Sequence, residues 1–411
     1  MRGTREVDVA VIGGGPAGLA AAAAAAAAGA NTLLVDRNAR LGGILNQCIH
    51  DGFGLHAFGE LLTGPEFADR YIARCLEAGA RTRSETLVVE LTPEREMICS
   101  TRGSRERLRA GAVVLAMGCR ERTRGMLRIP GSRPAGVYTA GTAQWLTNIA
   151  NVRVGHRVVV LGSGDIGLIM ARRLTWEGAR VVAVIEILPY PSGLPRNISQ
   201  CLEDYDIPLY LSHSVTSIHG AQRVEGVTVT QFDAARRPMP GTSFDLACDT
   251  LLLSVGLIPE NELSRRAGVA IDERTAGARV DSQYMTSVPG VFSCGNVLHI
   301  HDLADWAAEE GQRAGAQAAA FAVSRQAAPE TVTLAPGPGV RYVVPQAVSR
   351  SETRTLLSLR VAEPQDEATL QLTAGTRCLA TRRLRRAHPA TMIQWDVRLP
   401  DSESQLEVRL A

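Results

Sequence analysis

One segment near the start of the chain permits very few folds. It reads VDVAVIGGGPAGLAAAAAAAAAGANTLLVDR from Val7: an apolar strand, closely spaced glycines, a long apolar helix and a second strand that ends at Asp36. In such a unit Gly13 permits the tight turn, Gly15 lets backbone amides approach a pyrophosphate, and Gly18 lets the helix pack on the strand. The segment therefore predicts a dinucleotide-binding Rossmann unit, with the helix N-terminus facing the phosphates.

The same pattern occurs a second time, at HRVVVLGSGDIGLIMARRLTWEGARVVAVIE. The strand Arg157–Leu161 leads into Gly162, Gly164 and Gly167, and the following strand ends at Glu186. A carboxylate at that point accepts from a ribose 2′-hydroxyl and repels a 2′-phosphate, and no arginine immediately follows it. The sequence therefore favours NAD(H) over NADP(H) in this second unit.

Further strands of the same kind end in glycine. The stretches AGAVVLAMG (Ala110–Gly118) and CDTLLLSVGLIPE (Cys248–Glu260) suit the interior of a parallel sheet, where ligands bind at the carboxyl ends of the strands. A buried strand without cofactor contact explains each equally well. In VPGVFSCGNVLHIHDLADWAAEEG, the strand Val291–Cys294 ends at a glycine, and a helix is expected from about Asp302, with that residue as N-cap and Asp305 as its capping partner.

Composition restricts the class of protein. The 411 residues carry a net charge of +2 and are 45% apolar, so two or three globular domains are expected and no global field holds nucleic acid or a membrane surface. The eight cysteines are at least 20 residues apart, which disfavours a zinc or iron–sulfur site built from this chain alone. That spacing also gives no sign of a secreted disulfide framework, so we expect a cytoplasmic protein without direct membrane insertion.

The two units, the VVLAMG and LLLSVG strands and the PGVFSCGN segment resemble the two-dinucleotide-binding-domain flavoproteins, the superfamily of thioredoxin reductase and NADH oxidases. The resemblance covers residues 5 to about 325. It implies an α/β fold with two Rossmann-like three-layer domains, FAD in the first unit and NAD(P)H in the second. Asn296 stands where that superfamily has an aspartate that contacts the FAD ribityl chain.

Other segments resemble one subfamily in particular: GGILNQCIHDGFGLHAFGELLTGPEFA, IPGSRPAGVYTAGTAQ, RNISQCLEDYDIPLYLSHSV and CGNVLHIHDLADWAAEEG. They are similar to the flavoprotein subunits that accompany glycerol-3-phosphate or amino-acid dehydrogenases, and to the larger subunits of hydrogen cyanide synthase and opine or hydroxyproline dehydrogenases. This implies an FAD-dependent oxidoreductase that exchanges electrons with a partner dehydrogenase flavoprotein subunit. Any iron–sulfur cluster would then come from a small partner protein.

The pattern and the resemblance together select the candidate site residues. No metal ligands are expected, and Cys48 and His301 are the candidate catalytic residues, with His299 as an alternative to the second. For NAD the candidates are Gly162, Gly164, Asp165, Ile166, Gly167, Glu186 and Gly256. For FAD they are Gly13, Gly15, Pro16, Ala17, Gly18, Asp36, Arg37, Gly42, Gly43, Ala116, Gly118, Gly295 and Asn296.

Cys48 leaves the function open in one respect, because the disulfide reductases of the superfamily carry two cysteines in this region. We expect Cys48, His50 and His56 to line the flavin face away from the nicotinamide. A second hypothesis is a single-cysteine NADH oxidase or peroxidase, in which Cys48 cycles through a sulfenic acid and a helix N-terminus lowers its pKa. A third is a non-catalytic scaffold subunit that binds FAD and nucleotide structurally.

The expected domain organisation follows from these segments. Residues 1–125 and 260–327 form a discontinuous FAD-binding domain, and residues 126–259 form an inserted NAD-binding domain. The stretch SRQAAPETVTLAPGPG is typical of a linker, and residues 339–411 read as a small all-β module of alternating strands. Its arginine-rich segment Thr376–Pro389 is either a solvated strand and turn or a docking surface for a partner.

Overall fold

The computed structural model describes residues 2–324, 330–350, 352–399 and 405–411. The chain divides into two compact units, one made of residues 1–119 and 259–411 and the other of residues 120–258. Among the described residues, no helix combines the length and the apolar composition that crossing a lipid bilayer requires.

The first unit is built on one sheet of seven strands: β1 (Arg2–Ile12), β2 (Thr32–Val35), β3 (Arg81–Arg83), β4 (Leu87–Leu91), β5 (Glu96–Ser100), β6 (Arg105–Leu115) and β17 (Val291–Ser293). Strands β3, β2, β1, β6 and β17 are parallel, and β5 and β4 extend the sheet from β6 by antiparallel pairing. Ile12 pairs with Leu115, which pairs with Ser293. The carboxyl ends of β1, β6 and β17 therefore meet at one edge of the sheet.

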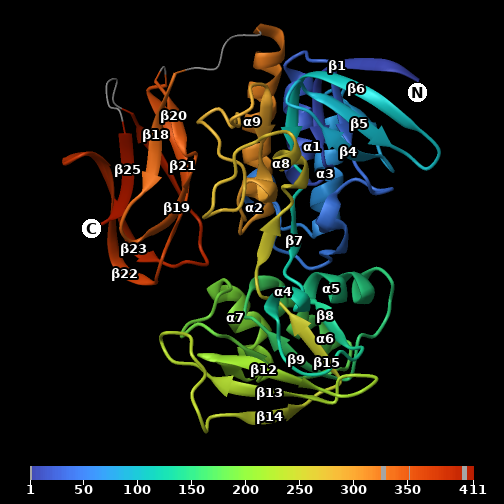
Figure 1. Ribbon diagram of the computed structural model, residues 1–411, viewed down its shortest axis with the longest axis vertical. Helices are drawn as coiled ribbons and strands as arrows, with labels where there is room; N and C mark the ends of the chain where they lie inside the picture. The colour runs from blue at the N-terminus through green and yellow to red at the C-terminus, as the bar shows by residue number, and fades with distance from the viewer. Residues whose placement is uncertain (1, 325–329, 351, 400–404) are drawn as a thin grey trace. The chain divides into compact units, whose positions relative to one another are not determined.

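Three longer helices of this unit are α1 (Pro16–Ala27), α3 (Gly64–Glu77) and α9 (Ala304–Ser324). The shorter ones are η1 (Gly43–Gln47), α2 (Leu55–Phe58), α8 (Glu262–Arg266) and η3 (Gly295–Val297). Helices α1 and α9 make the most extensive helix–helix contact of the unit (Figure 1).

The alanine run of α1 explains this contact. A Cβ atom on Gly311 would lie 2.1 Å from the carbonyl oxygen of Ala17, and one on Gly315 would lie 2.1 Å from that of Ala21. Only glycines on α9 and small residues on α1 allow the two backbones to approach this closely. The run therefore serves packing against a helix that lies almost 300 residues further along the chain.

The second unit contains a parallel five-stranded sheet in the order β11-β10-β9-β15-β8, made of β8 (Val137–Thr139), β9 (Arg157–Leu161), β10 (Arg180–Ile185), β11 (Leu209–Tyr210) and β15 (Thr250–Leu253). Its longer helices are α5 (Ala140–Asn148), α6 (Asp165–Trp176) and α7 (Pro195–Cys201). A separate antiparallel sheet consists of β12 (His213–His219), β13 (Gly226–Gln231) and β14 (Phe244–Ala247). The remaining short elements are β7 (Cys119–Glu121), α4 (Arg124–Leu127), η2 (Glu203–Tyr205) and β16 (Leu257–Pro259).

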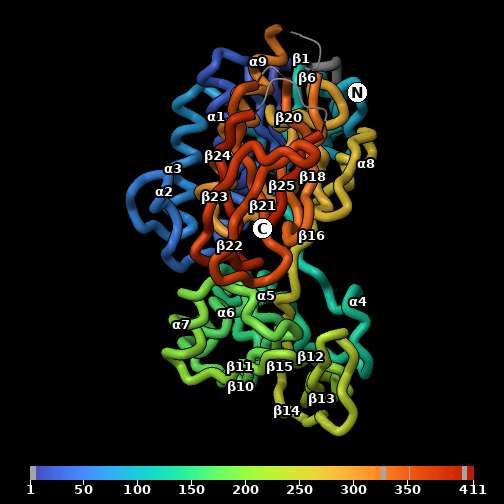
Figure 2. Tube along the Cα trace, turned by 90° about the vertical axis from the view of Figure 1, so that its left-hand side faces the viewer, coloured from blue at the N-terminus to red at the C-terminus, as the bar shows by residue number. Residues whose placement is uncertain are grey.

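The C-terminal module is an all-β part of the first unit, drawn in orange and red in Figure 2. One sheet has the order β20-β18-β25-β22-β23 and the other β19-β21-β24. The two sheets enclose their own apolar core. The strands are β18 (Thr331–Pro336), β19 (Val340–Val344), β20 (Ala347–Ser349), β21 (Arg354–Val361), β22 (Gln365–Ala374), β23 (Arg377–Ala387), β24 (Ile393–Arg398) and β25 (Gln405–Leu410).

One prediction about this region is wrong. The stretch Thr331–Pro336, which its neighbouring prolines and glycines indicate to be linker, is strand β18, paired with β20 and β25. Long-range pairing outweighs the local composition there. Residues 325–329 of the expected linker lie outside the described residues. The arginine-rich segment forms β23, an edge strand whose arginines are exposed.

Candidate functional site

The first glycine-rich turn is shaped by two contacts that only glycine permits. Gly13 has a φ of 107°, and a Cβ atom there would lie 2.3 Å from the carbonyl oxygen of Ala116, at the end of β6. A Cβ on Gly18 would lie 1.8 Å from the carbonyl oxygen of Gly13. These two glycines are therefore required by the fold itself, whatever the turn binds.

Gly15 differs because its missing side chain faces open space, with no atom within 4 Å of an ideal Cβ. It is the N-cap of α1, followed by Pro16, and no side chain caps this helix end. The unpartnered N–H groups of a first helical turn, together with the helix dipole, form an anion site. The turn therefore fits a pyrophosphate, which a larger residue at Gly15 would obstruct.

Asp36 and the Gly42-Gly43 pair border the same turn. The buried Asp36 carboxylate accepts from the N–H groups of Gly14 (2.6 Å) and Asn38 (2.7 Å), and the neighbouring Arg37 is exposed. Gly42 donates its N–H to the Gly14 carbonyl (2.8 Å). A Cβ on Gly43 would lie 3.1 Å from the Cα of Gly15, so this residue also lies close to the turn.

The segment after β17 reaches the same place. Gly295 has a φ of 72°, and a Cβ atom there would lie 2.6 Å from that of Ala17 in the first turn of α1. Asn296 follows, with its Oδ1 accepting from the backbone N–H of His301 (2.9 Å) and its Nδ2 pointing at the sulfur of Cys119 (3.7 Å). Ala116 and Gly118, at the end of β6, complete the group of candidate FAD residues around this turn.

Behind this segment lies a buried cluster of His299, His301 and Glu310. Glu310 Oε2 is 2.8 Å from His299 Nε2 and 3.5 Å from His301 Nε2, while its Oε1 accepts the Gly295 N–H at 2.7 Å. The exposed fractions of the three side chains are 0%, 2% and 6%. The atoms that they offer lie within 4.8 Å of one another, close enough to share one cation, either a proton or a metal ion.

Burial and the contacts between its members both shift the pKa values in this cluster. Burial raises the pKa of Glu310, but the two imidazoles and their hydrogen bonds outweigh burial and hold that pKa below its ordinary value. Burial lowers the pKa of His299, which favours its neutral form. Glu310 was not identified from the sequence. It lies three or four residues from Ala307 and Ala314, on the buried face of α9, and this helical spacing could have indicated a buried acid.

The predicted capping roles of Asp302 and Asp305 are wrong. Helix α9 begins at Ala304, and the Asp302 carboxylate instead accepts from Arg360 and from the Met392 N–H (2.5 Å). Asp305 accepts from backbone N–H groups of the segment that contains α2: those of Gly54 (3.1 Å), His56 (3.1 Å) and Ala57 (3.0 Å). Partners distant in sequence have displaced the local capping arrangement.

Cys48 does not lie at a helix N-terminus, where the single-cysteine hypothesis places it. It ends the short helix η1, is 5% exposed, and its Sγ lies 3.3 Å from the Ile44 carbonyl oxygen. His50 Nδ1 lies 2.8 Å from the Asp51 carbonyl oxygen, and the exposed His56 ring lies 6.1 Å from that of Trp306. This environment gives no support to a peroxide-reducing thiol.

The second glycine-rich turn repeats the geometry of the first. A Cβ on Gly162 (φ 96°) would lie 2.1 Å from the carbonyl oxygen of Ser254, at the end of β15, and one on Gly167 would lie 2.6 Å from the Ser254 Cβ. The buried Glu186 carboxylate accepts from the N–H of Ser163 (3.0 Å), as Asp36 accepts from Gly14. Glu186 Oε2 also accepts from the hydroxyl groups of Ser163 (2.6 Å) and Ser192 (2.8 Å).

The other candidate NAD residues lie around this turn. Gly164 is the N-cap of α6 and no side chain caps that helix end. Asp165 accepts from the Leu194 N–H (2.8 Å) and from Asn197 Nδ2 (2.6 Å), and therefore joins the turn to α7. Ile166 is half-buried, and the exposed Gly256 has a φ of 104°.

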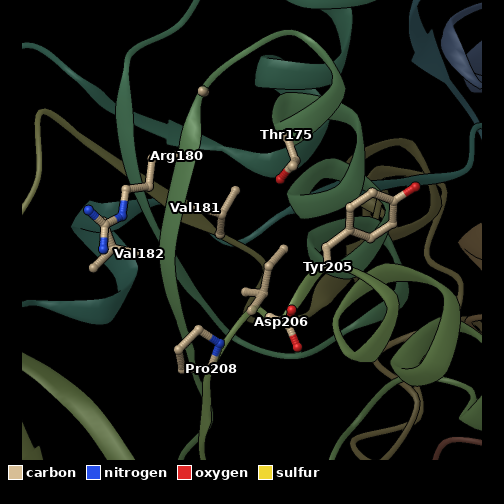
Figure 3. A pocket seen from close by; sticks show the side chains of 9 residues that line it. Thr175, Arg180, Val181, Val182, Tyr205, Asp206 and Pro208 are labelled. Atoms are coloured by element: carbon tan, nitrogen blue, oxygen red, sulfur yellow. The ribbon is translucent and has the colours of Figure 1, made fainter.

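A separate cavity of about 280 Å³ opens in the second unit (Figure 3). It lies at the beginning of β10, beside Arg180, whereas Glu186 follows the end of that strand. The cavity is therefore distinct from the glycine-rich turn. Its lining consists of Thr175, Ala179, Arg180, Val181, Val182, Tyr205, Asp206, Ile207 and Pro208.

Comparison with known proteins places this geometry in context. Residues 7–311 match the family described as pyridine nucleotide-disulphide oxidoreductase. The small chain of glutamate synthase [NADPH] from Mycobacterium tuberculosis is 30% identical over 368 residues, covering 79% of this chain and 68% of that protein. One of the subunits of opine oxidase from Agrobacterium tumefaciens is 27% identical, covering 70% of this chain and 61% of that protein.

Two further similarities complete the comparison. The HcnB subunit of hydrogen cyanide synthase from Pseudomonas protegens is 25% identical, covering 70% of this chain and 65% of that protein. This chain thus spans less than two thirds of the length of both the opine oxidase and the hydrogen cyanide synthase relatives. Thioredoxin reductase from T. acidophilum superposes with a TM-score of 0.64 at 25% identity, covering 78% of this chain and 100% of that structure. The expected fold class is thereby confirmed.

Proposed function

The chain belongs to the pyridine nucleotide-disulphide oxidoreductase family and is an oxidoreductase that uses FAD and a pyridine nucleotide; from this premise we propose that it transfers electrons between NAD(H) and FAD as one subunit of a multi-subunit dehydrogenase. The observation that carries the proposal is the repeated geometry of the two turns. In each, a glycine packs on a carbonyl group that follows a parallel strand, β6 in the first unit and β15 in the second. A buried carboxylate then accepts from the N–H of the residue after that glycine.

The residues of the first turn fit FAD. The α1 N-terminus and the open side of Gly15 would bind the pyrophosphate, and Asp36 would accept from a ribose hydroxyl. Gly43 and Gly295 would approach the cofactor through backbone alone, because each already touches the turn. When bound, FAD supplies the two-electron chemistry, and the protein supplies position and electrostatics.

Glu186 supports NADH over NADPH in the second turn. Its carboxylate is held at the turn by Ser163 and Ser192, with a backbone N–H of Leu188 on its other oxygen (3.0 Å). Such a carboxylate repels a 2′-phosphate. The glutamate synthase relative bears NADPH in its name, so cofactor preference is a property in which this chain can differ from its relatives.

A disulfide route for the electrons has no support in the sequence of this chain, because its eight cysteines lie at least 20 residues apart. A partner dehydrogenase flavoprotein is therefore proposed to take or supply them. Two observations favour a partner: two relatives are named as enzyme subunits, and the segment around Cys48 exposes apolar side chains, Ile44 at 54%, Leu55 at 55% and Leu61 at 64%.

The substrate of the complex belongs to the partner in this proposal. The names of the opine oxidase and hydrogen cyanide synthase subunits favour an amino-acid or opine-like substrate. Only the sequence resemblance supports glycerol 3-phosphate as the substrate. A small iron–sulfur protein is a further proposed partner, since the spacing of the eight cysteines disfavours a cluster ligated by this chain.

The experiment is anaerobic titration of the purified full-length chain with NADH. We expect bound yellow flavin that NADH bleaches. Failure of both NADH and the co-purifying dehydrogenase to bleach it would leave only the scaffold hypothesis. The variant Cys48→Ser separates the remaining alternative: a loss of NADH-linked turnover in that variant would favour the single-cysteine enzyme.

A further inference from the structure

The buried cluster of His299, His301 and Glu310 has no role in the proposed function so far, and its hydrogen bonds restrict where its protons lie. Asn296 directs its amide nitrogen at the Cys119 sulfur, so its Oδ1 faces His301. His301 Nδ1 lies 3.3 Å from that Oδ1, which can only accept. This contact favours the tautomer of His301 that carries a proton on Nδ1.

The other nitrogen of His301 faces a second acceptor. Its Nε2 lies 3.5 Å from Glu310 Oε2, which also accepts from His299 Nε2 at 2.8 Å. A lone pair on Nε2 would face a carboxylate oxygen in a buried site, an arrangement that is electrostatically unfavourable. One additional proton between the imidazoles and the carboxylate removes this conflict.

His299 is the poorer place for that proton. Its Nδ1 is buried and has no hydrogen-bond partner. If His299 is neutral, its Nδ1 carries a lone pair without a partner; if His299 is an imidazolium, its Nδ1 carries an N–H without an acceptor. The second state costs more free energy, because a buried charged group needs an acceptor at each of its donors. The His299 ring packs against the Tyr342 ring with 5.9 Å between their centroids, and His299 is only 1% exposed to solvent.

We propose that His299, His301 and Glu310 hold one proton beyond those of two neutral imidazoles and a carboxylate, and that this proton makes His301 an imidazolium beside the first glycine-rich turn. The position follows from contacts already described: His301 binds Asn296, and Gly295 touches Ala17 in the first turn of α1. With this proton the cluster is neutral overall, whereas without it the Glu310 carboxylate leaves one negative charge that disfavours an anion on the turn.

The second part of this inference rests on the proposed function. If the turn binds FAD, the charge on His301 favours the reduced, anionic flavin over the oxidised, neutral flavin. His301 is then a group that sets the electron affinity of the bound cofactor, whereas His299 and Glu310 position its proton. The first part, the charged state of the cluster, is independent of flavin.

Other groups around the cluster stay in one state across neutral pH. Burial raises the pKa of Tyr284 and of the Cys294 thiol, and keeps both neutral. The remaining groups that face the cluster are Arg313, which lies by Tyr284 and Glu310, Tyr342, whose pKa is also raised by burial, and Arg360, next to His299. Asp302, which pairs with Arg360, and the Cys119 sulfur, 3.7 Å from Asn296 Nδ2, also face this region, so the signals of the histidine rings themselves report the cluster.

The deciding experiment is nitrogen NMR of histidine-labelled full-length protein as a function of pH, compared with the variants His301→Gln and His299→Gln. We expect one imidazolium, protonated on both ring nitrogens, that is lost in His301→Gln. The matched control is His219→Gln, an exposed strand histidine of the other unit, which must leave that signal in place. Because Glu310→Gln leaves one acceptor oxygen where the Gly295 N–H and both histidines now share two, it can unfold the region, and His301→Gln therefore decides.

Two results would overturn the proton site: neutral imidazoles for both residues at about pH 7.5, or one equivalent of a transition metal retained after dialysis against a chelator. The flavin part has its own readout. We expect His301→Gln to shift the reduced-to-oxidised affinity ratio by about tenfold, which is a fall of about 30 mV for a two-electron couple. An unchanged potential overturns that part alone. If the chain binds no flavin, the proposed function fails while the NMR result still stands.

Discussion

Arg360 on β21 and Asp302, in the loop before α9, form an ion pair whose side chains are 10% and 6% exposed. The same guanidinium donates to the carbonyl groups of Ile300 (3.1 Å) and Pro389 (2.9 Å) and to the Tyr342 hydroxyl (3.1 Å). Burial of an ion pair is stable only when further hydrogen bonds satisfy both partners, as they do here. The C-terminal module thus holds the loop that carries His301.

The variant Arg360→Met tests this connection. It leaves the Asp302 carboxylate buried without its counter-charge, which costs about 3 to 5 kcal/mol. We expect amide hydrogen exchange in β21 and around His301 to accelerate accordingly. The matched control is Arg354→Met, whose pair with Asp396 is 62% and 48% exposed and should contribute little to stability, because solvent screens it. Equal effects of the two substitutions would contradict the assignment.

Two glycines of the first turn should respond differently to alanine. Gly15→Ala places a methyl group in open space at a φ of −79°, so the protein should fold normally and lose bound FAD. Gly13→Ala combines a φ of 107° with a clash at Ala116 and should destabilise the fold by about 3 kcal/mol or more. Flavin absorbance and the urea midpoint distinguish these outcomes. A Gly15→Ala protein with full FAD content would refute the assigned pyrophosphate site.

Glu186→Gln should change nucleotide preference. The variant retains an acceptor for Ser163 while it removes the negative charge, so the ratio of NADPH to NADH affinity should rise by about tenfold, or about 1.4 kcal/mol. Dissociation constants of the two nucleotides measure this ratio. Glu177→Gln, at the exposed end of α6, is the control and should leave it unchanged. An unchanged ratio of NADPH to NADH affinity in Glu186→Gln would show that the nucleotide ribose does not bind at Glu186.

Asp281 should make stability depend on pH. Burial, assisted by Glu352, raises its pKa to about 6, although its Oδ1 accepts from the N–H groups of Gln283 and Met285. An acid with a raised folded-state pKa binds its proton more tightly when folded. The contribution of Asp281 to the free energy of unfolding is therefore fully present below its unfolded-state pKa of about 4. It is lost as the pH rises through the folded-state pKa of about 6.

Asp281→Asn keeps the acceptor and removes the titration. We expect it to be more stable than the wild type by about 2 to 3 kcal/mol at about pH 8 and equally stable at about pH 3.5. Urea unfolding at several pH values gives the difference, and Asp69→Asn, exposed on α3, serves as the control. A difference that is constant with pH would show that Asp281 does not titrate in this range.

Local patterns predicted the elements of both turns closely. The strand Arg157–Leu161 has the expected ends, and the strand Thr32–Val35 stops directly before Asp36. The strand expected from Ala110 begins instead at Arg105, since antiparallel pairing with β5 extends it through polar residues whose side chains alone do not indicate a strand.

The sequence by itself therefore determined the two strand–glycine–helix units, the fold class and the positions of the two carboxylates, Asp36 and Glu186, because these depend on residues close together in the chain. Only the tertiary structure decided what Asp302, Asp305 and Glu310 do. Each of the first two could cap its own helix, but Asp302 pairs with Arg360, 58 positions away, and Asp305 binds backbone 248 to 251 positions away. A buried carboxylate takes the partners that compensate its desolvation, and here those partners come from packing rather than from neighbouring sequence.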